Sequence, residues 1–244
     1  MSMSPRPRDP RGWGPSPVQR CHLPRGFRWV RDNRGVTTTR DALLDELIDA
    51  GRHLVARGLV QASGGNLSAR LPGGDRFLVT ASGTWLDRLT ADDFCEVTLD
   101  GEVVSGAARP SVEWKLHQRT YVVREDVGAV VHLHPQHVLL VDMLGSPIRF
   151  TTLDHQFYVG SAGRVPFHPA GSQEIADAAA EAARDHDAVV LAHHGCSALG
   201  ESVRMALRRA VNLEEAATMT YRLLLAGDTT SDFPPEWAGR IIEV

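Results

Sequence analysis

The chain has 244 residues, of which 43% are hydrophobic and 23% carry a charge, as in an ordinary globular protein. A formal net charge of −4 offers no basic face for nucleic acid, and no apolar run reaches the roughly 18 residues of a membrane-spanning helix. Three widely spaced cysteines argue against a disulfide framework and a thiolate zinc site, so we expect a cytoplasmic protein without nucleic-acid or membrane partners.

Residues 1–36 differ from the rest of the chain. They are rich in Arg, Pro and Gly, and no apolar stretch follows the charges, so they are not a secretory signal. This composition cannot bury a core, which predicts a disordered extension; an upstream start codon chosen in error is the alternative. Trp13, Phe27 and Trp29 leave open that part of the segment docks on the domain. Residues 37–244 are predicted to form one domain.

Regular elements begin near residue 39. Apolar residues at helical spacing predict a helix that Thr39 caps and Gly58 ends. After it we expect a strand over residues 77–80, a capped helical turn over residues 90–93 and a hairpin over residues 95–104.

Two turns of small residues lie in this region. Gly64-Gly65-Asn66 comes before a strand, and Ser82-Gly83 follows residues 77–80. Backbone N–H groups in such turns can hold an anion. Each motif is also common as a plain turn, so neither assigns a binding site by itself.

Residues 109–124 are predicted to form the next helix, with Ser111 as its N-cap and Glu113 in its first turn. The free N–H groups at such a helix start favour an anion. The helix dipole alone also explains an acidic residue there, so both a structural and a catalytic role of Glu113 stay open at this point.

The strongest chemical pattern is His132-Leu133-His134, which follows a run typical of a buried strand and precedes Pro135. Residues two apart on a strand point to the same side, so His132 and His134 project together where the strand ends. This spacing suits two ligands on one metal ion. The alternative is that a histidine in a core strand is only a hydrogen-bonded core residue.

A second strand, predicted over residues 188–192, ends in His193-His194-Gly195 and offers a third imidazole. Three neutral nitrogen ligands leave a fourth position open for water or substrate, which is the pattern of a catalytic zinc site. Residues 151–159 stay unassigned, although His155 and Tyr158 could face a site. We expect the other helices of this half over residues 138–144, 174–184 and 203–225.

Taken in order, these motifs resemble the class II aldolase/adducin family over roughly residues 40–227, and the ordered set is far more specific than any one motif. The matching segments are Gly64-Gly65-Asn66-Leu67-Ser68, Thr80-Ala81-Ser82-Gly83, Pro110-Ser111-Val112-Glu113, Ala129-Val130-Val131-His132-Leu133-His134 and Ala192-His193-His194-Gly195.

The resemblance implies a three-layer α/β/α sandwich with a central, largely antiparallel sheet. It also implies a cyclic homotetramer with sites at subunit boundaries. By the same resemblance, His132, His134 and His194 bind the metal, His193 faces away, and Glu113 is the catalytic acid/base. The residues that would bind the substrate and its phosphate are Gly65, Asn66, Ser82, Gly83 and Ser111.

The chain departs from the family's aldolases in three respects. Those enzymes have Ser-Ser-Glu where this chain has Ser111-Val112-Glu113, so one phosphate-binding hydroxyl is missing; Ser82 replaces a threonine and keeps its hydroxyl. They also use tyrosines as proton donors, one of them in the C-terminal tail. This chain has no tyrosine after Tyr221, and Tyr158 is the candidate near the other position.

We interpret the chain as a zinc-dependent aldolase that cleaves or forms a carbon–carbon bond of a small phosphorylated ketose through a metal-stabilised enediolate. Glu113 would move the proton, with a pKa that burial raises above that of an exposed glutamate. One alternative is a metal-dependent decarboxylase of a keto sugar acid, which needs the missing tyrosines less. The other is a non-catalytic, adducin-like interaction module. Three histidines without a carboxylate ligand disfavour an iron-dependent oxygenase.

Overall fold

The computed structural model describes residues 39–107 and 109–238. The disordered extension predicted for residues 1–36 lies outside these residues and stays a prediction. In the part of the chain that is described, no helix is both long and apolar enough to cross a membrane.

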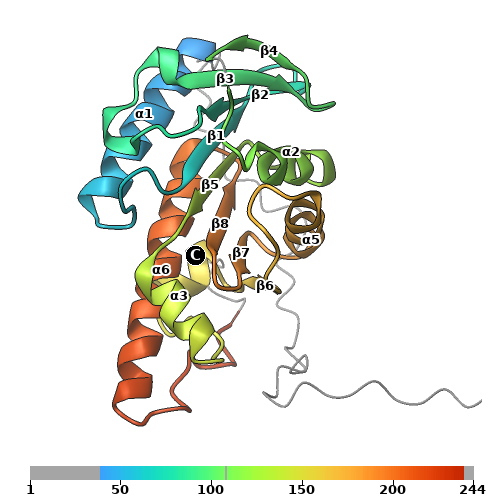
Figure 1. Ribbon diagram of the computed structural model, residues 1–244. Coiled ribbons are helices and arrows are strands. Elements are labelled where there is room, and N and C mark those ends of the chain that lie inside the picture. Colours follow the sequence, from blue (N-terminus) through green and yellow to red (C-terminus); the bar gives the residue numbers. More distant parts are fainter. Residues whose placement is uncertain (1–38, 108, 239–244) are drawn as a thin grey trace, which may run out of the picture.

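The strands of the described residues form a single eight-stranded sheet. They are β1 (Asn66–Arg70), β2 (Arg76–Thr80), β3 (Phe94–Thr98), β4 (Val103–Gly106), β5 (Ala129–Leu133), β6 (Gly163–Val165), β7 (Ala188–Leu191) and β8 (Gly195–Gly200). Their order across the sheet is β4-β3-β2-β1-β5-β8-β7-β6 (Figure 1). Neighbouring strands are antiparallel except for the parallel pair β6 and β7.

Helices cover both faces of this sheet. They are α1 (Arg40–Ala56), α2 (Trp114–Val123), α3 (Gln136–Met143), α4 (Leu153–Tyr158), α5 (Gln173–Ala183) and α6 (Val203–Leu225), with the short 3-10 turns η1 (Leu86–Arg88) and η2 (Ala91–Asp93). α1 and α6 pack on one face, and α2 and α5 pack on the other (Figure 1). The predicted three-layer α/β/α fold with a largely antiparallel sheet is therefore confirmed.

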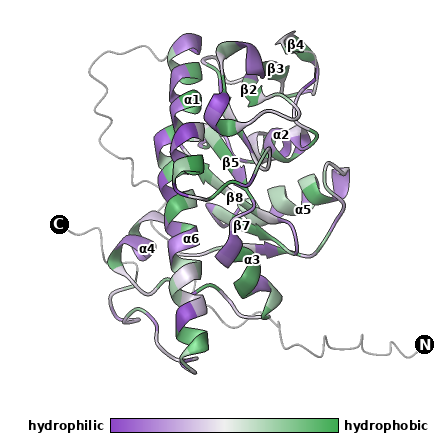
Figure 2. Ribbon diagram, turned by 60° about the vertical axis from the view of Figure 1, so that its left-hand side comes forward, coloured by the Kyte–Doolittle hydropathy of each residue, from purple (hydrophilic) through white to green (hydrophobic). Residues whose placement is uncertain are grey.

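The pattern of α1 explains how it attaches to the sheet. The Thr39 hydroxyl accepts a hydrogen bond from Ala42 N, as predicted for the cap. Leu43, Leu47 and Leu54 recur at helical spacing and are buried against β1 and β5. Each such leucine contributes about 1.5–3 kcal/mol by leaving water. Hydrophobic and hydrophilic bands alternate along α1 and α6 in Figure 2, as expected for helices with one buried side.

β5 lies at the centre of the sheet, and all five of its residues are buried. Val131 and Leu133 pack towards α1 and α6, whereas Val130 packs towards α2 and α5. Because side chains alternate along a strand, His132 lies on the same side as Val130. The hydrophobic run therefore fixes His132 in the layer between the sheet and α2.

The start of α2 corrects the sequence prediction. Ser111 is not its N-cap: Ser111 N donates to Thr80 O at 2.9 Å, and Pro110 pairs with Ala81 in an isolated bridge. These bonds hold the segment against the sheet, so the N-cap lies two residues later than predicted. Glu113 becomes the N-cap residue, and its side chain makes no capping hydrogen bond. The three-residue strand β6, the six-residue strand β8 and the helix α4 were also not predicted.

Candidate metal centre and substrate cleft

Three imidazole rings converge where β5 ends. His132 lies on the strand with none of its surface exposed, and His134 directly follows the strand. Their Nε2 atoms are 3.0 Å apart. The ring centroids of His132, His134 and His194 lie 5.0 Å apart in each pair. The structure thus brings together the three histidines that the sequence singled out.

His194 lies in the tight turn between β7 and β8 rather than on a strand. His193 before it adopts φ 57°, a left-handed conformation uncommon for a residue other than glycine, and is exposed to solvent. At Gly195 an added Cβ would lie 2.2 Å from Leu133 O and 2.6 Å from His134 Cδ2. Glycine is therefore required for the turn to approach β5 closely enough to place His194 beside the other two rings.

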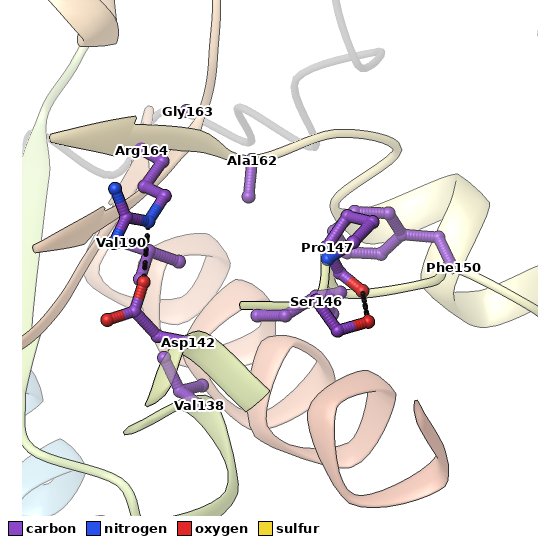
Figure 3. A pocket seen from close by; sticks show the side chains of 10 residues that line it. Val138, Asp142, Ser146, Pro147, Phe150, Ala162, Gly163, Arg164 and Val190 are labelled. Atoms are coloured by element: carbon purple, nitrogen blue, oxygen red, sulfur yellow. Dashed lines mark hydrogen bonds and ion pairs between the residues drawn. The ribbon is translucent and has the colours of Figure 1, made fainter. Parts of the chain in front are cut away.

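Asp142 of α3 holds the backbone of this turn, a contact that the sequence did not reveal. Its Oδ2 accepts a hydrogen bond from His193 N at 3.3 Å, and its Oδ1 accepts one from Arg164 Nε at 2.6 Å. Asp142 and Arg164 face each other at one side of a cavity of about 70 Å³, with Pro147 at the other side (Figure 3). The ion pair with Arg164 holds this buried carboxylate in the orientation that accepts from the turn.

Glu113 faces the imidazoles from the start of α2. Its Oε2 lies 3.1 Å from His132 Nε2, and its Oε1 lies 3.0 Å from His194 Nε2. The residue is only 5% exposed. Although Glu113 is the N-cap residue of α2, its side chain makes no capping hydrogen bond and faces the imidazoles instead, so capping alone does not account for it.

Burial and the neighbouring rings set the charges in the site. Burial raises the pKa of Glu113, but the imidazoles of His132 and His194 outweigh burial and hold that pKa well below its usual range. The raised pKa expected from the sequence is therefore wrong, because that expectation weighed burial alone. Burial, with His132 and His194 nearby, lowers the pKa of His134 to about 4. Its ring is thus neutral at pH 7, as a metal ligand must be.

These side chains fit a divalent metal ion. Glu113, His132, His134 and His194 each offer one ligand atom, and the four atoms lie within 4.8 Å of one another. Neutral imidazoles and a carboxylate are ligands that zinc and similar ions accept. Ser197 lies opposite His132 in the register of β5 and β8, and its hydroxyl is 3.4 Å from His132 Nδ1. A neighbouring strand therefore supports this ring from behind.

A cleft of about 240 Å³ opens over this cluster and is also lined by Glu113, His134 and His194. Gly65 adopts φ 79°, and an added Cβ would lie 2.7 Å from His132 O, so only glycine lets this turn pass so close to β5. Val112, 65% exposed, occupies the place of the missing hydroxyl at the wall of the cleft. All five residues predicted to bind substrate line it: Gly65, Asn66, Ser82, Gly83 and Ser111.

His155 and Tyr158, which the sequence left open as site residues, do not line this cleft. Both belong to α4, which packs against α6. In the described part of the chain, no tyrosine is among the residues that line the cleft.

Hydrogen bonds behind Glu113 were also missed from the sequence. Asn66 Nδ2 donates to Glu113 Oε2 at 3.0 Å, and Asn66 Oδ1 lies 2.5 Å from His117 Nε2. Glu113 and His117 are four residues apart, a spacing that places two side chains on one side of a helix. That spacing was the signal available in the sequence.

Comparisons with known proteins agree with this geometry. The profile of one family, the class II aldolase and adducin N-terminal domain, matches residues 45–221. A 5-methylthioribulose-1-phosphate/5-deoxyribulose-1-phosphate aldolase of Rhodospirillum rubrum is 36% identical over 191 residues, 76% of this chain and 83% of that protein. A 3-oxo-tetronate 4-phosphate decarboxylase of Escherichia coli O6:H1 is 34% identical over 187 residues, 75% and 87% of the two chains. The crystal structure of L-fuculose-1-phosphate aldolase from Thermus thermophilus has a TM-score of 0.69 and 33% identity, and the match covers 78% of this chain and 99% of that one.

Proposed function

Because the chain belongs to the class II aldolase and adducin family, we propose that it is a metal-dependent aldolase that cleaves or forms a carbon–carbon bond of a small phosphorylated ketose. The observation that carries this proposal is the convergence of His132, His134, His194 and Glu113 beneath a cleft lined by small polar turns. The relatives named as aldolases of sugar phosphates support the substrate class.

His132, His134 and His194 would hold the ion, and we propose zinc because the donors are mainly imidazole nitrogens. When bound, the ion supplies Lewis-acid stabilisation of the negative charge that develops on the substrate oxygens. The chain contributes rigidity: His132 is enclosed between two strands, and the turn that carries His194 is held by Asp142. Rings fixed in this way aim their nitrogen lone pairs at one point at little entropic cost.

Glu113 would be the group that moves the proton. In the addition direction its carboxylate removes a proton from the donor carbon beside the carbonyl group, and in the cleavage direction it returns a proton to that carbon. Its low pKa keeps it ionised and therefore able to accept. Its place between the imidazoles and the cleft gives it access to a carbon next to the metal-binding oxygens.

The small residues of the cleft would bind the phosphate group. Gly65 and Gly83 both have positive φ, which turns backbone N–H groups towards one side, and Ser82 and Ser111 add hydroxyls. The Asn66 side chain uses one amide hydrogen on Glu113 and has a second for the substrate. A homotetramer with sites at subunit boundaries stays a prediction, and it would explain how a tyrosine could reach the cleft. A cytoplasmic location also stays a prediction.

A decarboxylase acting on a keto sugar acid phosphate is the second candidate, because a relative named as such a decarboxylase matches 75% of the chain. One experiment distinguishes the two. The metal content of the purified protein is measured, and the protein is then screened against ketose phosphates and keto acid phosphates. Carbon–carbon cleavage to two carbonyl products supports the aldolase, whereas release of CO₂ supports the decarboxylase. No turnover with any divalent metal would indicate an adducin-like interaction module.

A further inference from the structure

A row of buried polar side chains runs from Glu113 into the core. Asn66 is 4% exposed, Ser68 and His117 have no exposed surface, and Tyr121 is 1% exposed. Asn66 Nδ2 lies 3.0 Å from Glu113 Oε2, and Asn66 Oδ1 lies 2.5 Å from His117 Nε2. The Ser68 hydroxyl oxygen lies 2.6 Å from His117 Nδ1 and 2.7 Å from the Tyr121 hydroxyl. Four hydrogen bonds thus connect the carboxylate of the site with a tyrosine on the inner side of α2.

The row results from the spacing of side chains on one side of a strand combined with the spacing on one side of a helix. Asn66 and Ser68 are two residues apart on β1 and therefore point to the same side of the sheet. Glu113, His117 and Tyr121 are each four residues apart at the start and along the inner side of α2. Because α2 packs against β1 here, the side chains of the two elements alternate along the row. The order is Glu113, Asn66, His117, Ser68 and Tyr121.

The position of each hydrogen follows from the carboxylate. An ionised carboxylate only accepts, so Asn66 must present its N–H₂ to Glu113 and its oxygen to His117. That oxygen also only accepts, so His117 must carry its hydrogen on Nε2. Burial, reinforced by the neighbouring His132, lowers the pKa of His117 to about 3, so the ring is neutral and its Nδ1 is an acceptor.

The remaining hydrogens are then determined as well. Ser68 must donate its hydroxyl hydrogen to His117 Nδ1, which leaves the Ser68 oxygen to accept from the Tyr121 hydroxyl. Burial raises the pKa of Tyr121, so the phenol keeps its hydrogen. In every hydrogen bond of the row, the donor is therefore the group farther from Glu113 and the acceptor is the group nearer to it.

We propose that His117, Ser68 and Tyr121 are positioning residues that hold the Asn66 amide in the one orientation that donates to Glu113. The role for catalysis rests on the proposed function, in which Glu113 moves the proton. The contact matters because the imidazole nitrogens facing Glu113 are the atoms that would bind the ion. A nitrogen that binds a metal cannot donate a hydrogen bond as well. Among the described side chains, Asn66 is then the hydrogen-bond donor that Glu113 retains.

Nitrogen NMR of the full chain, labelled at its histidines, tests the direction of the bonds without any substrate. His117 is identified as the resonance lost in His117→Gln. We expect the neutral ring with its hydrogen on Nε2 from about pH 5 to about pH 8, with and without zinc. A hydrogen on Nδ1, or a charged ring in this range, would overturn the proposal. If the protein turned over no substrate, the proposed function would fail, and this spectrum would still decide the direction of the row.

A matched pair of variants tests the role for Glu113. In His117→Gln the amide nitrogen can replace Nε2 and still donate to Asn66, whereas His117→Asn reaches only the place of Nδ1 and leaves the Asn66 oxygen unpaired. We expect kcat of His117→Asn to fall about 10–100-fold, with KM and zinc content little changed, and His117→Gln to retain most of the activity. His155→Asn is the control, because this buried histidine does not line the cleft. Equal loss in both His117 variants, or no loss in either, contradicts a positioning role through Asn66.

Discussion

Replacing Glu113 with Gln separates proton transfer from metal binding and from folding. The substitution keeps the shape of a side chain that is 5% exposed, and the amide oxygen can still accept from Asn66. The three histidines remain to hold the ion. An amide cannot exchange a proton, so we expect kcat to fall about 10²–10⁴-fold, which corresponds to about 3–5 kcal/mol in the barrier.

The assay has three parts: metal content per chain, steady-state kinetics on the substrate found by the screen, and the melting temperature. We expect the loss in kcat, with KM and metal content near those of the parent protein. Glu214→Gln is the control, since Glu214 also pairs with a histidine, at 2.8 Å from His137 Nδ1, but does not line the cleft. Near-normal turnover of Glu113→Gln together with a lower melting temperature would refute the catalytic assignment.

Three further predictions concern the metal and the N-terminal segment. His194→Ala should abolish metal retention, measured by elemental analysis after desalting, whereas His193→Ala should weaken it less because His193 is exposed; the reverse result would reassign the ligand. Asp142→Ala should lower metal affinity about 10–100-fold in competition with a chelator, and Asp142→Asn less, because the amide can still accept from His193 N. Equal metal affinity of the parent protein, Asp142→Ala and Asp142→Asn would show that the turn does not need Asp142. Removing residues 1–36 should shift the melting temperature by only a few degrees, and a large loss would show that this segment docks on the domain.

The histidines of the site could be predicted from the sequence because their signals are local. A strand followed by His132-Leu133-His134 places two rings together through the period of the strand alone. His194 was assigned by resemblance; its actual position depends on a turn that brings β8 beside β5. The local sequence contains no information about that pairing except for the glycine at position 195.

Other features could not be predicted because they arise from contacts between distant segments. β8 is buried at all six of its residues, so its sequence shows no alternation between hydrophobic and polar side chains. β6 has three residues and exists through parallel pairing with β7. Ser111 has the local signature of an N-cap, but its bond to Thr80 O keeps it on the sheet. In each case a tertiary contact overrides the local preference.

The last prediction concerns the stability of the protein below neutral pH. The change of that stability with pH depends on whether His117 is charged in the folded protein. Burial, reinforced by the neighbouring His132 and opposed by Glu113, lowers the pKa of His117 from 6.5 to about 3. Between these two values the unfolded chain binds a proton at His117 that the folded chain does not. Stability therefore rises with pH across this window. The contribution of His117 is fully present above pH 6.5 and is lost progressively as the pH falls towards 3.

His117→Gln removes this titration and leaves the other groups in place, including His134, whose pKa is also lowered. A plot of the free energy of unfolding against pH should therefore be less steep in the variant, by at most about 1.4 kcal/mol per pH unit, the value for one proton. Urea denaturation of both proteins without metal at several pH values inside the window measures the two slopes. Equal slopes would mean that folded His117 binds the proton too. A charged ring has no acceptor nitrogen for Ser68, so that result would also break the row of hydrogen bonds that leads to Glu113.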